Sequence, residues 1–457
     1  MKQIHLAAQL PPVQHTTARA DPSSRTRFAF DSLARLAQTA ERGRFDFLLL
    51  SEEPRPSGGE GHVHDPDEVL RAAESLTVLS ALAAVTTRLG LAATVDSTFN
   101  EPYEVARRLA TLDHLSDGRA AWHVVSGHSA FTGGNFRRGS FLDPADRHTR
   151  AAEFLRAARE LWDSWRPGDV RADAEAGAFI QAGAGRFAHR GEHFDISGRF
   201  GTPRGPQGHP VIIHSGDSPE ERVFAASHAD VVLGDHGGLE DGRAFYQDVK
   251  GRLAAYGRVP GELKILPPAT YALGDTSEEA AEHAAEISRA RIGPQTAIAR
   301  LEAVWGRDLS GYDPDGPLPD IDPLPDAEIT HGPTRYRRGA TVRRWREIAE
   351  ERGLSIRELV IEVTGRPTFV GTARQVADSI DESVQTGAAD GFVFVPHLPS
   401  GGLADLVDRV VPLLQEKGVF RAEYTGTTLR DHLGLEQART ARAGRSGTDG
   451  HAGKETP

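Results

Sequence analysis

The 457-residue sequence contains no cysteine. This absence excludes disulfide bonds, thiolate-bound metals, iron–sulfur clusters and a cysteine nucleophile. No run approaches about 18 consecutive apolar residues, and the first residues, Met1 to Leu6, do not form the apolar core of a signal peptide. We therefore expect no transmembrane helix, no membrane partner and a cytoplasmic location.

The sequence also lacks an excess of positive charge. Its 53 Lys and Arg residues are outnumbered by 65 Asp and Glu residues, which gives a formal net charge of −12. A chain of this charge repels polyanions unless it carries a local basic patch. No basic stripe with interleaved aromatic residues is present. We therefore expect no nucleic-acid partner.

Several motifs of catalytic sites are missing as well. No G-x-G-x-x-G follows the early predicted strands, and neither a P-loop nor a G-x-S-x-G elbow occurs. These absences argue against a dinucleotide-binding sheet and against a Ser-His-Asp hydrolase. A metal-dependent barrel hydrolase is a weak alternative, because His62 and His64 lie in a Gly- and Pro-rich loop without further ligands. We predict no metal site.

What the sequence does contain is a regular alternation of short apolar runs and amphipathic segments. The runs have the length of strands and end in polar residues, which is typical of buried parallel strands. They occupy residues 4–9, 45–50, 89–95, 120–125, 211–214, 230–233, 263–273 and 391–395. Helices are predicted over residues 32–42, 67–85, 102–115, 146–165, 219–228, 239–256, 276–305, 340–352, 355–363, 373–386 and 403–416.

This alternation predicts a parallel sheet with helical crossovers, either closed into a TIM-type (β/α)₈ barrel or open and doubly wound. The number of repeats favours the closed barrel. No linker divides the chain, so we predict one domain over residues 1–436, with an insertion around 274–340. Residues 166–208 are expected to form an extended loop or a small hairpin, and 437–457 a disordered tail.

Polar residues gather directly after the predicted strands. In a (β/α)₈ barrel the active site lies at the carboxyl ends of the strands, so these residues converge on one face. They are Ser51, Glu52, Asp96, Ser97, Thr98, Asn100, His123, Ser126, Gly127, His128, the segments 215–218 and 235–238, and His397. The sequence therefore predicts a polar pocket at this face.

The segment 215–221 supports two interpretations. As a helix start, it has Ser218 at the N-cap, Pro219 at the first helical position and Glu221 completing a capping box. As a binding loop, it has Gly216 and backbone N–H groups that would face a phosphate at a helix N-terminus. The two interpretations are compatible, although Asp217 and Glu221 argue mildly against an anion there.

A set of ordered segments resembles one enzyme family. They are residues 45–52 (FDFLLLSE), 94–103 (TVDSTFNEPY), 106–126 (ARRLATLDHLSDGRAAWHVVS), 189–194 (HRGEHF), 203–232, 371–378 (GTARQVAD) and 424–434 (YTGTTLRDHLG). Together they resemble the nitrilotriacetate, dibenzothiophene-sulfone and pristinamycin-synthase group of FMNH₂-dependent monooxygenases in the bacterial-luciferase superfamily. The resemblance runs from about residue 3 to residue 434.

The resemblance implies a luciferase-like barrel that forms a homodimer or homotetramer. It implies FMN bound as FMNH₂, supplied by a separate NAD(P)H:flavin reductase, with O₂ as co-substrate. A peroxyflavin would then oxidise a small organic substrate. The resemblance does not choose among C–S cleavage, N-oxidation, Baeyer–Villiger oxidation and dehydrogenation.

The resemblance also places cofactor-binding residues. The family's strand-two acid falls on Glu52, its strand-three hydroxyl on Thr98 and its phosphate-side serine on Ser218. Arg147 or Arg150 is a further candidate partner for the phosphate, with a helix-surface arginine as the alternative. The predicted cofactor-binding residues are Glu52, Thr98, His123, Ser126, His148, Gly216, Asp217 and Ser218.

Several positions depart from the family pattern. His123 stands where the family has Asn, Pro144 and His148 stand where it has His and Tyr, and Asp217 stands where it often has Ser. We predict His123 and His128 as catalytic residues, because imidazole titrates near neutral pH. The alternative for each is a packed or hydrogen-bonded strand histidine.

Two other functions on the same fold stay open. One is a deazaflavin-dependent oxidoreductase that transfers hydride without oxygen. The other is a non-catalytic flavin-binding relative, an interpretation that the departures from the family pattern favour.

Overall fold

The computed structural model describes most of the chain. The described residues are 1–10, 29–51, 73–126, 144–173, 178–234, 238–324, 338–365, 368–397 and 402–437.

The central feature is a parallel sheet with the strand order β11-β10-β9-β4-β3-β2-β1-β15-β12. The strands are β1 (His5–Gln9), β2 (Phe47–Leu50), β3 (Gly90–Asp96), β4 (Ala120–Val125), β9 (Val211–Ser215), β10 (Val231–Leu233), β11 (Lys264–Ile265), β12 (Pro268–Ala269) and β15 (Gly391–Phe394). From β1 to β11 the order in the sheet is the order along the chain, so each crossover joins neighbouring strands. Only β12 and β15 depart from this order.

The sheet closes on itself through the segment 264–269. Its first half, β11, pairs with β10, and its second half, β12, pairs with β15. The N–H of Leu266 donates to the carbonyl of Val232 at 2.9 Å, and the N–H of Val393 donates to the carbonyl of Pro267 at 3.1 Å. Because β11 and β12 are one continuous segment, the sheet is a closed ring, which confirms the predicted (β/α)₈ barrel.

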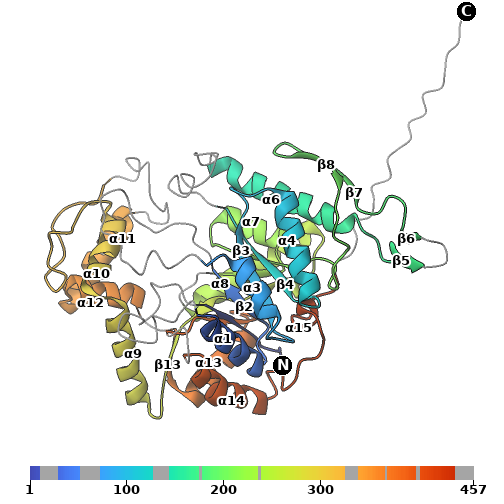
Figure 1. Ribbon diagram of the computed structural model, residues 1–457. Coiled ribbons are helices and arrows are strands. Elements are labelled where there is room, and N and C mark those ends of the chain that lie inside the picture. The colour runs from blue at the N-terminus through green and yellow to red at the C-terminus, as the bar shows by residue number, and fades with distance from the viewer. Residues whose placement is uncertain are drawn as a thin grey trace, which may run out of the picture.

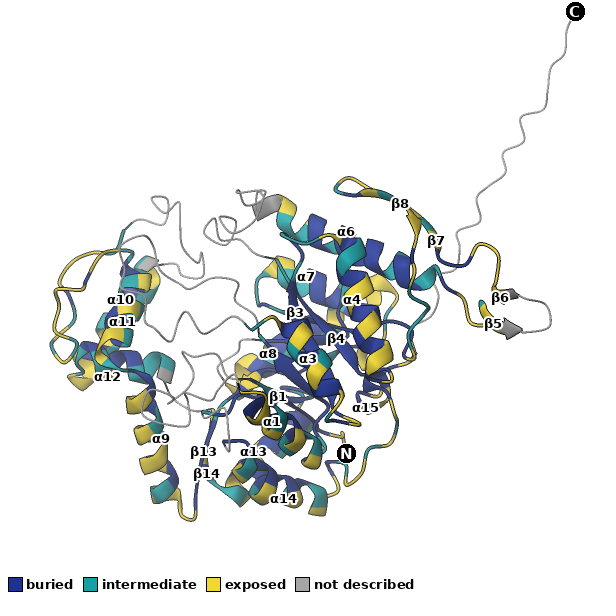
Figure 2. Ribbon diagram, in the orientation of Figure 1, coloured by how far each residue is buried: buried dark blue, intermediate teal, exposed yellow. Residues whose placement is uncertain are grey.

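Helices cover the outside of the barrel and bury one face each against it, as Figure 2 shows by the dark blue sides that they turn inward. They are α1 (Phe30–Arg42), α3 (Ser75–Ala83), α4 (Pro102–Leu115), α6 (Pro144–Asp163), α7 (Pro219–His228), α8 (Leu239–Arg252), α13 (Ala373–Gln385) and α14 (Val411–Glu416). In α1 the buried residues Leu33, Leu36, Ala37 and Ala40 recur at helical spacing, as the sequence predicts. Short 3₁₀ helices, Leu253–Tyr256 and Pro260–Glu262, follow α8, and a π-helical turn, Leu406–Val410, precedes α14.

Alternate strand residues point into the barrel. Ala7, Phe47, Leu49, Ala92, Ala121, Val211, Ile213, Val231, Leu233 and Val393 form one cluster there. The residues between them join the larger cluster under the helices. Because successive side chains of a strand point to opposite faces, each strand contributes to a core inside the barrel and to a core between the barrel and its helices.

Two excursions leave the barrel. Residues 166–208 hold two antiparallel hairpins, β5 (Val170–Asp173) with β6 (Ala178–Ile180) and β7 (Arg186–Arg190) with β8 (Asp195–Arg199), where a loop or one small hairpin was expected. The second excursion, which we call the insertion, lies between the parallel strands β13 (Tyr271–Gly274) and β14 (Phe369–Thr372).

The insertion has its own hydrophobic cluster around Trp305 and Trp345. Its helices are α9 (Ser277–Arg291), α10 (Pro294–Trp305), α11 (Arg338–Arg352) and α12 (Ile356–Val360), followed by a π-helical turn, Ile361–Gly365. It therefore extends beyond the expected residues 274–340. The division of the chain into one domain stays a prediction, and the expected tail lies outside the described residues beyond Gln437.

Two predicted elements are broken in the structure. The expected strand 263–273 is three short strands, because Pro267 and Pro268 interrupt the backbone hydrogen bonding and β13 leaves the barrel. The expected helix 276–305 is two helices, because Pro294 starts a new helix after Gly293.

Candidate functional site

One end of the barrel is closed by the C-terminal helix α15 (Leu429–His432). The N–H of Leu429 donates to the carbonyl of Gly118 at 3.0 Å, just ahead of β4. Leu429 and Leu433 join the inward-facing side chains of the barrel. Figure 1 shows α15 and the insertion on opposite sides of the barrel. The carboxyl ends of the strands therefore belong to the end that α15 leaves open.

At this open end, three neighbouring strands bring Thr94, His123 and Ser215 into one hydrogen-bonded row. Thr94 on β3 is the register partner of His123 on β4. The Oγ1 of Thr94 lies 3.0 Å from Nδ1 of His123, and the Oγ of Ser215 lies 3.0 Å from Nε2 of the same ring. Thr94 and His123 are buried, whereas Ser215, the last residue of β9, is partly exposed.

The strand period explains why this row faces inward. Ala92, Ala121 and Ile213 all point into the barrel, and each is followed two residues later by a member of the row. The sequence therefore changes from apolar to polar along the inner face as the strands approach their carboxyl ends.

His123 is neutral in this position. Burial, with a smaller contribution from the nearby His214, lowers its pKa to about 3. The sequence argument that this imidazole titrates near neutral pH is therefore wrong for His123, because the folded protein removes the water that would stabilise the charged ring. A neutral ring still donates one hydrogen bond and accepts another.

A second polar group lies between β9, α6 and α7. His214 is 7% exposed, its Nδ1 lies 3.4 Å from the carbonyl of Val124, and its Nε2 has no hydrogen-bond partner among the described residues. Arg147 places Nη2 3.1 Å from Nε2 of His148, and its own Nε is likewise buried without a partner there. Burial lowers the pKa of His214 to about 4 and also lowers the pKa of His148.

The charges of Glu221 and Arg147 act on the two histidines of this group. The carboxylate of Glu221 raises, and the guanidinium of Arg147 lowers, the pKa of both His148 and His214. The charges of these side chains therefore influence one another beside the N-terminus of α7, and His214 and Arg147 each keep a buried nitrogen without a partner among the described residues.

The predicted capping box at Ser218 is confirmed. The Oγ of Ser218 accepts from the N–H of Glu221 at 3.2 Å, and Oε2 of Glu221 accepts from the N–H groups of Asp217 (2.9 Å) and Ser218 (3.1 Å). The N–H groups of Asp217 and Ser218 thus bind Glu221 here, so the phosphate cradle stays a prediction that needs donors other than these two. A Cβ on Gly216 would lie 2.2 Å from the same carboxylate, and Asp217 pairs with Arg222 at 2.9 Å.

Thr98 and Ser126 lie where the sequence places them, after β3 and β4. Thr98 is buried, and its N–H donates to Oδ1 of Asp96 at 2.5 Å. The N–H of Ser97 donates to the carbonyl of Val125 at 2.8 Å, which ties the two strand ends together. Ser126 is half-buried at the end of β4.

Arg150 has a structural position. It is 3% exposed, donates to the carbonyl of Ser97, and stacks 4.6 Å above the ring of Phe194. These contacts hold it in the wall between α6 and the β7–β8 hairpin, which excludes the alternative of a helix-surface arginine.

Other predicted positions lie outside the described residues. They are Glu52, Gly127 and His128, together with His62, His64 and residues 235–237, and the side chain of Pro144 is not described either. Their roles stay predictions.

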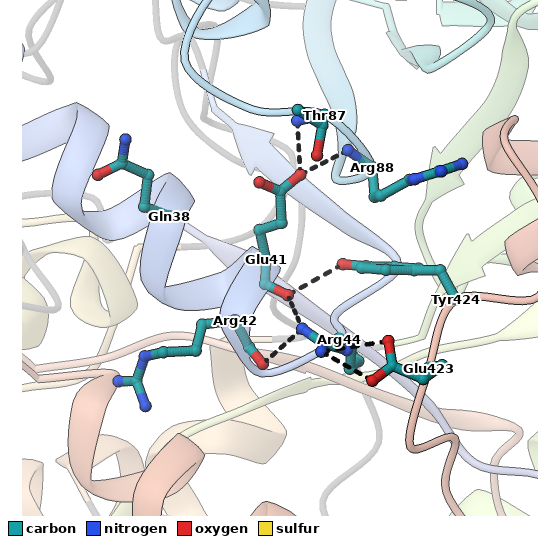
Figure 3. Close-up of a pocket in the computed structure, with 8 residues that line it drawn as sticks. All are labelled: Gln38, Glu41, Arg42, Arg44, Thr87, Arg88, Glu423 and Tyr424. Carbon is teal, nitrogen blue, oxygen red and sulfur yellow. Dashed lines mark hydrogen bonds and ion pairs between the residues drawn. The ribbon is translucent and has the colours of Figure 1, made fainter.

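The cavity in Figure 3 lies at the opposite, closed end and has a volume of ≈ 450 Å³. It is lined by Gln38, Glu41, Arg42, Arg44, Thr87, Arg88, Glu423 and Tyr424. Glu41 accepts from the N–H groups of Thr87, Arg88 and Leu89, and Arg44 pairs with Glu423 at 3.3 Å. Glu41 and Arg44 thus connect separate segments of the chain, so this cavity joins structural elements and is not the candidate site.

Sequence reasoning missed Thr94, His214 and the hydrogen-bonding role of Ser215. The alternation of the strands could have found Thr94, because it stands two residues after the small inward residue Ala92. His214 points the other way, toward the helices, and only the packed structure shows that its Nε2 is unsatisfied.

Comparison with known proteins identifies the family. The chain matches the luciferase-like monooxygenase model over residues 8–390. It belongs to this family. It is 39% identical over 445 residues to N-acetyl-S-(2-succino)cysteine monooxygenase of Bacillus subtilis, covering 95% of this chain and 97% of the relative. It is 38% identical over 421 residues to nitrilotriacetate monooxygenase component A of Aminobacter aminovorans, covering 89% and 90%.

A solved structure agrees with these matches. Riboflavin lyase, determined with modified FMN and the substrate riboflavin, superposes with a TM-score of 0.78 at 27% identity, covering 95% of this chain and 97% of that one. The predicted family, the luciferase-like barrel and the assignment as a monooxygenase are thereby confirmed.

Two further findings concern the described ranges of this luciferase-like chain. No helix there is long and apolar enough to cross a bilayer. No three potential metal ligands cluster there either.

Proposed function

We propose that this chain is the oxygenase component of a two-component, flavin-dependent monooxygenase. It would bind FMN in the reduced form, FMNH₂, receive it from a separate NAD(P)H:flavin reductase, and use O₂ to oxidise a small organic substrate. Membership of the luciferase-like family carries this proposal, and the polar row at the open end of the barrel supports it.

The residues at the open end fit a flavin phosphate, although not in the expected way. Arg147 and His214 each hold a buried nitrogen without a partner in the described part of the chain. The hydroxyl of Ser218 accepts from Glu221 and keeps its own hydrogen for donation. We infer that side chains, above all Arg147 and Ser218, would hold the phosphate at the N-terminus of α7.

When bound, reduced FMN supplies the electrons that activate O₂. The protein's part is to place the reacting groups and exclude water. Thr98, His123 and Ser126 line the strand ends where the flavin ring would lie. His123 would act there as a neutral hydrogen-bonding group, because its pKa of about 3 prevents the ring from taking up the second proton of an imidazolium at pH 7.

The assembly of the protein also belongs to the proposal. We infer a homodimer or homotetramer that meets the reductase only transiently, in the cytoplasm. The substrate is a small organic molecule whose class the described residues do not fix.

Anaerobic titration with FMN and with FMNH₂, followed by admission of air, tests the proposal. We expect tighter binding of FMNH₂ and then a transient near-ultraviolet absorption band. Binding of neither form would refute the proposal and favour the deazaflavin-dependent or the non-catalytic alternative. Oxygen consumption during turnover separates the monooxygenase from a deazaflavin-dependent hydride transferase.

A further inference from the structure

The positions of the hydrogens in the row Thr94–His123–Ser215 follow from which groups have other partners. Thr94 is 4% exposed, and within the described ranges its Oγ1 contacts only Nδ1 of His123. If the ring donated from Nδ1 to Thr94, the hydroxyl hydrogen of Thr94 would find no acceptor there. A buried donor without an acceptor is strongly disfavoured, so Thr94 donates to Nδ1.

This assignment fixes the rest of the row. A neutral imidazole carries one N–H, so with Nδ1 accepting, the hydrogen sits on Nε2. Nε2 then donates to Oγ of Ser215, 3.0 Å away. The hydrogen of Ser215 must point away from the ring. Because Ser215 is the partly exposed member and ends β9, that hydrogen points toward the open end of the barrel.

We propose that Thr94 and His123 form a directional relay that presents the hydroxyl of Ser215 as a fixed hydrogen-bond donor to an acceptor atom of the bound flavin ring. The acceptor is a carbonyl oxygen or an unprotonated ring nitrogen. Ser215 would touch the ligand, whereas Thr94 acts through His123 and is a positioning residue. The flavin as recipient rests on the proposed function, but the direction of the relay does not.

The direction of the relay can be tested on the protein without ligand. Long-range ¹H–¹⁵N spectra of histidine-labelled protein, with His123→Gln to assign the signal, report the tautomer. We expect protonated Nε2 and unprotonated Nδ1 at pH 7. A ring protonated at Nδ1, or at both nitrogens, would overturn the proposal. In Thr94→Val we expect the tautomer preference to be lost, and in Thr94→Ser we expect it to be kept.

Flavin affinity tests the end of the relay. We expect Ser215→Ala and Thr94→Val each to weaken anaerobic FMNH₂ binding about 3–10-fold, the effect of one hydrogen bond. The FMNH₂ affinity of Thr94→Ser should lie within about twofold of that of the native protein. This result would show that the loss in Thr94→Val comes from the missing hydroxyl and not from a change in the fold. Unchanged affinity in folded Ser215→Ala would overturn the assignment of the flavin as recipient. Failure of the native protein to bind flavin would instead refute the proposed function, while the tautomer result would stand.

Discussion

The two ends of the barrel differ in how their buried polar side chains are paired. At the closed end, Asp46 is fully buried, pairs with Arg421 and His5, and accepts from the N–H of Leu6 at 3.0 Å. In the row at the open end, a neutral histidine joins two hydroxyls, of which that of Ser215 is partly exposed. The Asp46 cluster uses opposite charges, and the row uses neutral groups.

This difference separates stability from function. Charged side chains that pair with one another keep few donors or acceptors for a ligand. They therefore suit an end of the barrel that has a structural role only. Neutral groups at the open end keep a donor or acceptor for a ligand, as Ser215 and the unpaired Nε2 of His214 illustrate. Changes at the closed end should therefore affect folding first, and changes at the open end should affect binding and turnover.

The largest expected effect is at Asp46. Replacing Arg421 with Ala leaves a buried carboxylate with too few partners and should lower the free energy of unfolding by about 3–5 kcal/mol. Urea denaturation measures this loss. A loss below about 1 kcal/mol would mean that the closed end does not depend on its charges.

His123→Gln should give the complementary result at the open end. Loss of the ring that fixes the Ser215 hydroxyl toward the site should lower O₂-dependent turnover about 10²-fold. The free energy of unfolding should change by less than about 1.5 kcal/mol, because the new side chain has a similar volume. Steady-state kinetics and urea denaturation of the same preparation check both parts. Unchanged turnover would remove His123 from the site.

Asp113 is an exception within the closed end, because burial raises its pKa to about 6. Its Oδ1 accepts from Nε2 of Gln207 at 2.6 Å, while Oδ2 has no partner in the described part of the chain. A carboxyl whose pKa is raised on folding loses stability as pH rises from about 4 to about 6. Asp113→Asn should therefore raise the free energy of unfolding by about 1–3 kcal/mol at pH 7. Near pH 4 the gain should vanish, and a gain independent of pH would contradict this account.

The neutral state of His123 predicts a pH dependence of the opposite sign. Its pKa is lowered on folding, so the unfolded chain binds the proton first as pH falls below about 6.5, and stability decreases toward about pH 3. At pH 5 the contribution is about 2 kcal/mol. Denaturation at pH 7 and pH 5 should show a smaller decrease in His123→Gln than in the native protein. Equal decreases would indicate that the ring is accessible to protons in the fold.

The smallest expected effect is at an exposed pair of the same chemistry as Asp46 and Arg421. Arg42 contacts Asp408 with both side chains about half exposed. Arg42→Ala should change the free energy of unfolding by less than about 1 kcal/mol, because water screens the pair. This variant is the matched control for Arg421→Ala, and a comparable loss in both would remove burial as the explanation.

Elements with strong local signals are predictable from the sequence alone. The helix 102–115 starts at a proline, the helix 219–228 starts at a capping box, and the structure has both with the predicted bounds. The strand 120–125 also matches. The breaks in 263–273 and 276–305 fall at Pro267–Pro268 and at Gly293–Pro294, where helical or apolar residues on both sides conceal the interruption unless the prolines are weighed first.

The candidate site is less predictable than the fold. His123 is evident from its place near a strand end, but its partners are 29 residues before it and 92 residues after it. Strand register brings them together, and burial sets the charge of the ring. The capping box at Ser218 is predictable, whereas its consequence, that Glu221 takes the N–H groups meant for a phosphate, depends on side-chain geometry.

The closure of the barrel by α15 also has a consequence for the synthesis of the protein. Leu429 and Leu433 are among the last described residues, yet they pack against strands that begin near the N-terminus. A nascent chain on the ribosome therefore carries an unplugged barrel until residues 429–433 have left the exit tunnel. Until then the inner apolar surface is open at this end, where a chaperone can bind it.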